Sequence, residues 1–207
     1  MSTRTAGKSR SEARARLLDT ATRIFYAEGI HSVGVDRIIA EAQVTRATLY
    51  RHFKGKDELI LAYLQQADRG IRGQVAAIRA QGLPAAETVR AVGRSIADGI
   101  ESPGFRGCAF LNAVAEYPDP AHPVHQAVLD HRQWFLETVT QLMEDAARTP
   151  ADVTGRHFVM LRDGAMAAGC LFDPTLIRAT FLEGVEGILR AGAAPAPGPD
   201  SAAPLSA

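Results

Sequence analysis

Apolar side chains recur at intervals of three and four residues along almost the whole chain, and this spacing restricts what it can fold into. Leu17, Ala21 and Ile24 follow the pattern early in the chain, and Val89 and Val92 follow it later. Such spacing places apolar side chains on one face of a helix. No segment shows the alternation of period two that is typical of a half-buried strand, nor an internal repeat. The sequence therefore predicts an all-α fold of about nine helices.

Proline, glycine and capping residues divide the pattern into separate helices. The predicted helices cover about residues 10–28, 35–42, 46–53, 57–79, 84–100, 108–117, 124–147, 151–171 and 175–190. From Ala191 onward the chain is rich in Ala, Pro, Gly and Ser and poor in large apolar residues. A segment of that composition cannot bury enough apolar surface to fold, so we predict a disordered tail over residues 191–207.

A formal net charge of zero conceals a basic N-terminal part and an acidic remainder. Residues 1–56 hold eleven Lys and Arg residues against five Asp and Glu residues, a net charge of +6. Because the whole chain has 23 residues of each sign, the rest carries −6. A basic module joined to an acidic body is typical of a protein that binds a polyanion, although a chance excess of surface arginine would give the same numbers.

Composition excludes several other classes of protein. With 46% hydrophobic and 22% charged residues, the chain can bury a core, yet it has no apolar run of the about twenty residues that a membrane span needs. The first ten residues lack the apolar stretch of a secretory signal. Cys108 and Cys170 lie far apart, which indicates a cytoplasmic protein without a disulfide framework or a cysteine metal site.

Residues 35–53 contain two short helical patterns joined by a tight turn, an arrangement that can place its second helix in the major groove of DNA. Ile38, Ile39, Val44 and Leu49 would pack inward. The side chains left outside are hydrogen-bond donors without an acidic residue among them, and are suited to phosphates and base edges. They are Thr45, Arg46, Thr48, Tyr50 and Arg51. The alternative is a small helical bundle with a basic surface.

The segment from Ile38 to Leu59 resembles the DNA-binding domain of the tetracycline-repressor family, and the specific part is Thr-Leu-Tyr-Arg-His-Phe at residues 48–53 followed by Lys56. The resemblance covers about residues 12–60. It implies phosphate contacts for Tyr50, His52 and Lys56. It makes Thr45, Arg46 and Thr48 the candidates for base contacts, with Arg51 on the same binding surface.

Two positions depart from the pattern of that family. Gln43 stands where the turn usually has glycine, so we expect it to adopt the turn geometry at some conformational cost. Gly34 stands where a threonine or serine usually caps the next helix, and it is a weaker but acceptable cap.

The resemblance also implies a division of the chain by function. We expect a flexible basic arm over residues 1–9, a helix-turn-helix domain over 10–56, and a larger helical regulatory and dimerisation domain over 57–190. The last two helices of that body would pair with those of a second copy. The candidates for this interface are Gly164, Ala165, Ala168, Phe181, Val185, Ile188 and Leu189, each of which is equally interpretable as ordinary core.

A ligand pocket is expected among the middle helices, where aromatic and sulfur side chains suit a small apolar compound. The candidates are Phe105, Cys108, Phe110, Asn112, His131, Trp134, Phe135, Met160 and Phe172, although at helical spacing such residues are more often core. The expected partners are a pseudo-palindromic DNA operator, a second copy of the chain and an unidentified small-molecule effector, with repression as the family default.

The region that holds Asp119, His122, His125, Asp130 and His131 is the candidate for a metal site. Its prolines indicate a turn at a helix start, where Asp and His commonly act as caps, and only two histidines share a helical face. We therefore expect no metal and no cofactor. A helical metal-dependent enzyme and a protein-interaction bundle are the alternatives, and both leave the donor-rich segment at residues 45–51 unexplained.

Overall fold

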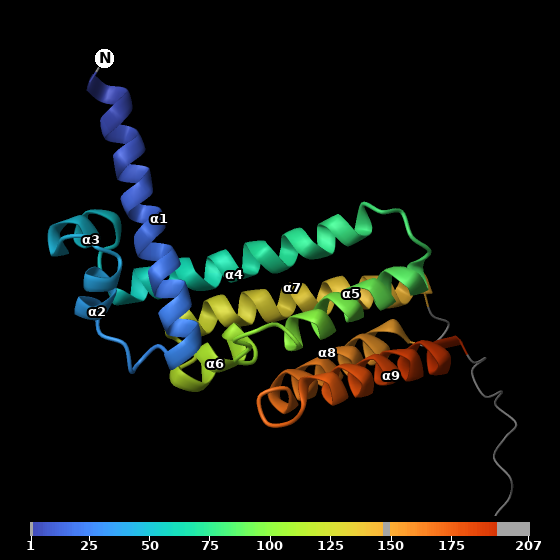
Figure 1. The fold of residues 1–207 in the computed structure, drawn as a ribbon. Helices are drawn as coiled ribbons and strands as arrows, with labels where there is room; N and C mark the ends of the chain where they lie inside the picture. Colours follow the sequence, from blue (N-terminus) through green and yellow to red (C-terminus); the bar gives the residue numbers. More distant parts are fainter. Residues whose placement is uncertain (1, 147–149, 194–207) are drawn as a thin grey trace, which may run out of the picture. The chain divides into compact units, whose positions relative to one another are not determined.

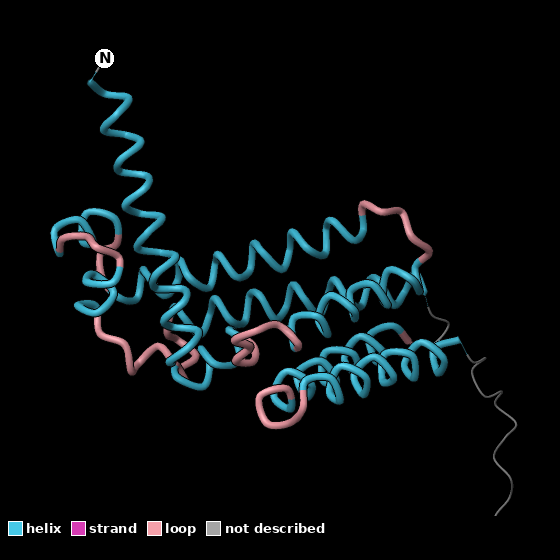
Figure 2. Tube along the Cα trace, in the orientation of Figure 1, coloured by secondary structure: helices cyan, strands magenta, loops and turns pink. Residues whose placement is uncertain are grey.

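The computed structural model describes residues 2–146 and 150–193, and the helices that it contains there follow the predicted pattern. They are α1 (Ser2–Glu28), α2 (Val35–Glu41), α3 (Arg46–His52), α4 (Lys56–Arg79), α5 (Ala85–Ile100), α6 (Ala109–Glu116), α7 (Pro123–Ala146), α8 (Ala151–Ala168) and α9 (Pro174–Ala193). Figure 2 shows helices and connecting loops without a strand over these residues. The predicted all-α class with nine helices is confirmed for the described part of the chain.

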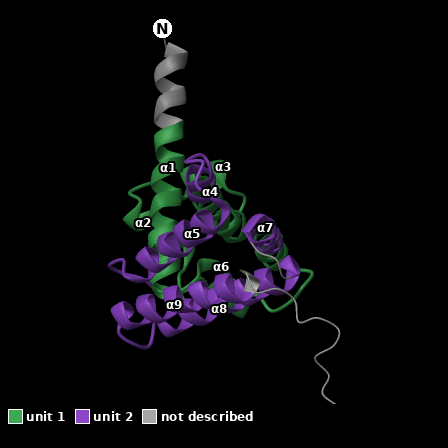
Figure 3. Cartoon of the chain, turned by 90° about the vertical axis from the view of Figure 1, so that its right-hand side faces the viewer, with its two compact units in different colours: residues 1–73, 106–132 green, residues 74–105, 133–207 purple. Residues whose placement is uncertain are grey.

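The chain forms two compact units, shown in different colours in Figure 3. Unit 1 comprises residues 1–73 and 106–132, and unit 2 comprises residues 74–105 and 133–207. The expected division at residues 56 and 57 is one of function, whereas the compact units follow contacts. Unit 1 therefore includes the first parts of α4 and α7 and the whole of α6, together with α1, α2 and α3. Figure 1 labels these helices.

In unit 1 the short helices α2 and α3 pack against α1 through side chains that are buried completely. Leu17 and Ile24 of α1, Ile38 of α2 and Leu49 of α3 are each fully buried. A helix of seven residues is not stable alone in water, so this burial holds α2 and α3 in place. At about 1.5–3 kcal/mol for each large apolar side chain, it is the dominant stabilising contribution in this part of the chain.

Hydrogen bonds from α6 and the loop before it hold the end of α1. The carboxylate of Glu116, the last residue of α6, accepts the backbone N–H of Ile30 at 2.8 Å and of His31 at 2.5 Å. The hydroxyl of Tyr26 accepts the backbone N–H of Arg106 and donates to the carbonyl of Gly107, both at 2.9 Å. Both ends of α6 are therefore attached to the region in which α1 ends and the loop to α2 begins.

Unit 2 is built around a core to which α5, α7, α8 and α9 contribute. Its largest fully buried side chains are Ile100, Phe158 and Phe181, and the last two meet edge to face at 6.1 Å. Helix α9 packs against both α5 and α8. Gly184 on α9 faces Leu161 so closely that a Cβ there would lie 2.7 Å from a leucine methyl carbon. Small residues thus permit close helix contact inside this unit.

Both predicted ends of the chain differ from the structure where it describes them. Helix α1 begins at Ser2, within the predicted arm of residues 1–9. Helix α9 continues to Ala193, three residues into the predicted tail, and residues 194–207 lie outside the described part. Among the described helices, none has the length and apolar content that crossing a bilayer requires.

Replacing Glu116 by glutamine tests the attachment of α6 to α1. The amide side chain can accept one of the two backbone N–H groups with its oxygen but offers no second acceptor, so one charge-assisted hydrogen bond is lost. We expect hydrogen exchange of the Ile30 or His31 amide to accelerate about tenfold or more, corresponding to about 1.5–3 kcal/mol for a bond to a charged group. Glu12→Gln, at an exposed site on α1, is the control. Unchanged exchange at both amides would contradict the attachment.

Candidate nucleic-acid interface

The turn between α2 and α3 has the geometry that its residues predict. Gln43 has a φ of +52°, as expected for a residue in the place of a turn glycine, and it is a non-glycine residue in the left-handed region. Gly34 is the N-cap of α2. Its backbone is extended, and it has no side chain to accept a capping hydrogen bond. Thr45 is the N-cap of α3, and its hydroxyl accepts the backbone N–H of Thr48 at 3.1 Å. Both departures from the family pattern are thus accommodated locally.

Helix α3 separates a buried face from an exposed one. Leu49 is completely buried and Phe53, directly after the helix, is 2% exposed, so these residues fix its orientation. On the other side Thr45, Arg46 and Arg51 are exposed, and Tyr50 exposes 48% of its surface. The predicted donors are therefore presented together along one side of a fixed helix.

Not every predicted contact residue is equally accessible. Thr48 is half-buried and its hydroxyl lies 2.9 Å from that of Thr45, so the two threonines act as one polar pair at the start of α3. Arg46 forms an ion pair with Asp36 at the start of α2. The exposed face of α3 itself holds no acidic residue, as predicted, but the fold brings Asp36 from α2 beside it.

The predicted phosphate-binding residues lie around the end of α3 and the start of α4. His52 and Lys56 are half-buried. Burial lowers the pKa of Lys56, and the nearby carboxylates of Glu116 and Asp57 offset part of this effect. Withdrawal of the ammonium group from water is compensated when an anion approaches it. Lys54 is exposed beside it, and its backbone N–H donates to Glu58 at 2.5 Å.

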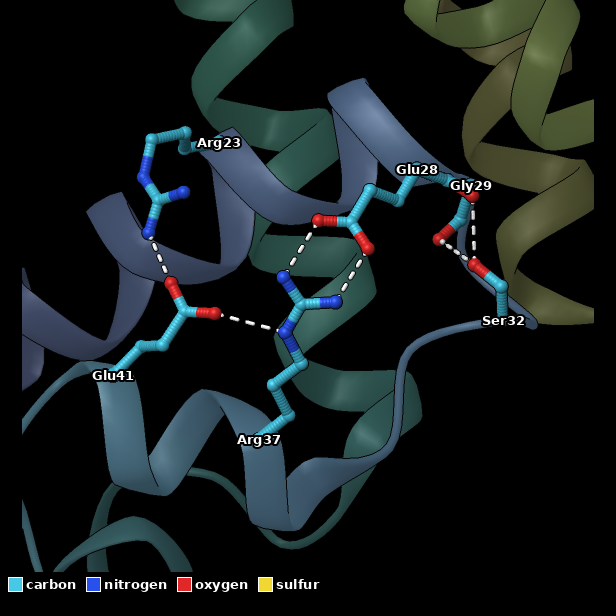
Figure 4. A network of polar contacts seen from close by, with 6 residues as sticks. All are labelled: Arg23, Glu28, Gly29, Ser32, Arg37 and Glu41. Carbon is cyan, nitrogen blue, oxygen red and sulfur yellow. Dashed lines mark hydrogen bonds and ion pairs between the residues drawn. The ribbon is translucent and has the colours of Figure 1, made fainter.

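An ion-pair network on the surface connects α1 and α2 (Figure 4). Both terminal nitrogens of Arg37 donate to the Glu28 carboxylate at the end of α1, and its Nε donates to Glu41 at 2.8 Å. Glu41 also accepts from Arg23 at 2.5 Å. The bonds to Glu28 and then Glu41 raise the pKa of Arg37, and the bonds from Arg23 and then Arg37 lower that of Glu41. The network supports the angle at which α2, and with it α3, leaves α1.

The residues predicted to bind a ligand are divided between the two units. Cys108, Phe110, Asn112 and His131 belong to unit 1, and Phe105, Trp134, Phe135, Met160 and Phe172 belong to unit 2. Asn112 is exposed and donates to the Arg106 carbonyl at 2.8 Å. Met160 and Phe172 are 71% and 62% exposed, so the single chain encloses neither of them. Helical spacing groups residues on a face without saying what that face meets.

The residues predicted at the dimer interface fall into two groups. Phe181, Val185 and Leu189 are buried in the core of unit 2 and Ile188 packs against it, which is the placement of ordinary core residues. Gly164 is exposed, with open space where a Cβ would point. Gly164, Ala165 and Ala168 line a shallow apolar groove of about 340 Å³ along α8 and α9, together with Met160 and Phe181.

The histidines of the region considered for a metal have other bonding roles. The ring of His122 accepts the backbone N–H of Val124 at 3.2 Å, at the start of α7. Nδ1 of His125 lies 2.8 Å from the carbonyl oxygen of Tyr117, and Nδ1 of His131 lies 2.8 Å from Asp68. Within residues 2–146 and 150–193, no group of three or more Cys, His, Asp or Glu residues has the arrangement of a metal site.

Sequence reasoning missed Tyr26, Asp68 and Glu116. Asp68 leaves a local signal, because it interrupts the apolar face of α4 and a carboxylate there needs a partner. Tyr26 and Glu116 contact backbone groups 80 to 86 positions away, and the sequence contains no local signal of such pairs.

Residues 17–63 match the model of a family described as bacterial regulatory proteins, tetR family. The chain is 41% identical over 71 residues to the HTH-type transcriptional activator FasR of Mycolicibacterium smegmatis, and 39% identical over 64 residues to the HTH-type regulator SrpR of Pseudomonas putida. These matches cover 34% and 31% of this chain, and about a third of each relative (32% and 30%).

A solved structure extends the similarity over nearly the whole chain. SCO4454, a TetR-family transcriptional regulator from Streptomyces coelicolor, is 74% identical in sequence with a TM-score of 0.87. The match covers 89% of this chain and 97% of that one. With the helix-turn-helix geometry of α2 and α3, this similarity shows that the chain belongs to the TetR family of transcriptional regulators.

Proposed function

We propose that this regulator binds a specific DNA operator with α3 in the major groove and represses transcription until a small molecule bound in its helical body releases it. The observation that carries the DNA contact is the two-sided environment of α3. Leu49 is completely buried, whereas Arg46, Tyr50 and Arg51 are exposed. Because this short helix is held in place before binding, its side chains can contact base edges without a folding step.

The proposal assigns different tasks to different residues. Thr45, Arg46 and Thr48 lie at the N-terminal end of α3, the end that meets base edges in helix-turn-helix proteins. Tyr50, Arg51, His52 and Lys56 contact phosphates and set the register of the helix on the duplex. To reach a base, Arg46 exchanges its pairing with Asp36 for one in the groove. Asp36 thereby favours bases that offer Arg46 a bidentate acceptor, as guanine does.

A homodimer through α8 and α9 completes the proposal, because a two-fold symmetric protein matches a pseudo-palindromic operator. Large apolar side chains are exposed on these two helices and the turn between them. Met160, Leu171 and Leu176 are 71%, 74% and 61% exposed. Met160 lines the apolar groove beside Gly164, where a partner helix has room to approach closely. Exposed apolar surface on this scale is typical of an interface.

Arg46→Ala and Lys56→Ala separate base reading from phosphate binding. We expect Arg46→Ala to weaken operator binding by about 1–3 kcal/mol and to relax the preference for one base pair. Lys56→Ala should weaken binding to all sequences alike and reduce the salt slope by about one. The measurement is fluorescence anisotropy on operator and random duplexes over a salt series. Arg69→Ala, an exposed arginine on α4, is the matched control. Equal losses on both duplexes for both variants would contradict this division.

Leu176→Glu tests the dimer. Two like charges placed in a desolvated apolar interface oppose association, so we expect a monomer at about micromolar concentration under conditions in which the wild type is a dimer. Leu129→Glu introduces the same change at a leucine that is 45% exposed on α7, and it should remain dimeric. Analytical ultracentrifugation distinguishes the two. A Leu176→Glu protein that sediments as the wild-type dimer would show that the interface lies elsewhere.

A further inference from the structure

Unit 1 contains a pocket of about 280 Å³ between the first part of α4, α6 and the first part of α7. Phe110 of α6 and His131 of α7 form its floor, with their rings stacked in parallel at 3.6 Å. Leu64 and Ala127 contribute apolar wall, and Asp130 stands exposed at the rim. Its volume lies just below the range of about 300–1,000 Å³ for drug-sized ligands, so it fits a small molecule.

The floor of the pocket is organised by a chain of polar contacts. His131 is almost completely buried, and its Nδ1 lies 2.8 Å from Oδ1 of Asp68 on α4. Nε of Arg72, one turn further along, donates to the other oxygen of Asp68 at 2.7 Å. Burial acts to raise the pKa of Asp68, but the bonds from His131 and Arg72 outweigh it, and the net shift is downward. The carboxylate is therefore ionised and fixed at neutral pH.

The charges that face the pocket favour a positively charged ligand. Asp68 and Asp130 are the carboxylates among the lining residues, and Arg72 is their single permanent cation. Arg72 and Asp68 neutralise each other, which leaves the charge of Asp130 at the rim. A cation with a small apolar body can place its charge beside Asp130 and its body against Leu64 and the Phe110 ring.

We propose that this pocket binds a small organic cation, an amine attached to a compact apolar group, and that it is the effector site. The inference rests on the proposed function, since it names the ligand class for a regulator released by a small molecule. Occupation of the pocket acts first on Phe110, and hence on α6, the helix that carries this residue.

Helix α6 is also the element that reaches the DNA-binding helices within unit 1. Glu116 at its end holds the amides of Ile30 and His31, four to five residues before α2 begins, and Tyr26 holds the loop before α6. A displacement of α6 is therefore shared by the segment that leads into α2. A ligand that binds better to a shifted α6 changes the population of DNA-competent heads in proportion to its differential affinity.

The test uses benzylamine, which is protonated at pH 7, with benzyl alcohol and benzoate as neutral and anionic molecules of similar shape. Isothermal titration calorimetry on the full-length protein without DNA should show binding of benzylamine at least about tenfold tighter than of the other two. Asp130→Asn should weaken it about tenfold, and Ala127→Leu, which fills the pocket, should abolish it. Glu137→Gln removes a carboxylate from α7 outside the pocket and should bind as the wild type does.

Equal affinities for the three compounds, or an Asp130→Asn protein that binds benzylamine as the wild type does, would overturn the ligand class. Saturating benzylamine should also change hydrogen exchange at the Ile30 and His31 amides, and unchanged exchange despite binding would overturn the effector role. These readouts contain no DNA, so their failure leaves the proposed function standing. Loss of specific DNA binding by the ligand-free protein would contradict the proposed function itself.

Discussion

The burial of two seven-residue helices against α1 is the constraint on which the DNA-binding part of this protein depends. Neither α2 nor α3 has enough internal hydrogen bonds to persist alone. Ile38 and Leu49 are completely buried, and this one face of contact both stabilises the helices and decides which side chains remain outside. The hydrogen-bond donors of α3 are exposed because the burial of Leu49 turns the opposite face of the helix toward solvent. An enlarged or polar residue at position 49 would thus affect recognition and stability together.

Polar contacts then fix the orientation that burial leaves adjustable. Arg37 connects α2 to the end of α1 through Glu28, and Glu116 holds the backbone between them from α6. The two act differently. The Arg37 network is exposed to water, so it contributes little to stability and mainly orients α2 relative to α1. Glu116 satisfies backbone donors that the end of α1 would otherwise leave to solvent. The same carboxylate makes α6 the link between the pocket of unit 1 and the head.

Much of this structure follows from local rules that the sequence displays. The Thr45 cap and the order of helices could be predicted because each depends on neighbouring residues. The positive φ of Gln43 is expected from the family resemblance instead, since that family usually has glycine in the turn. The surroundings of α8 could not, because this helix is apolar on more than one side. The side-chain type of Met160 suggests a ligand pocket and its helical spacing suggests core, whereas the fold leaves it exposed beside Gly164. Contacts such as Glu116 with Ile30 join residues 86 positions apart, so they emerge only from the tertiary fold.

Selection of bound sequences from a random duplex library, using the wild-type protein, tests the central claim most directly. The account predicts enrichment of a pseudo-palindrome whose half-sites lie about one helical turn or a multiple of it apart, as two α3 helices in successive major grooves require. Enriched positions should include a guanine in each half-site, in reach of Arg46. A library that emerges without a shared motif, or with a single unpaired half-site, would contradict the account of a dimer that reads DNA through α3.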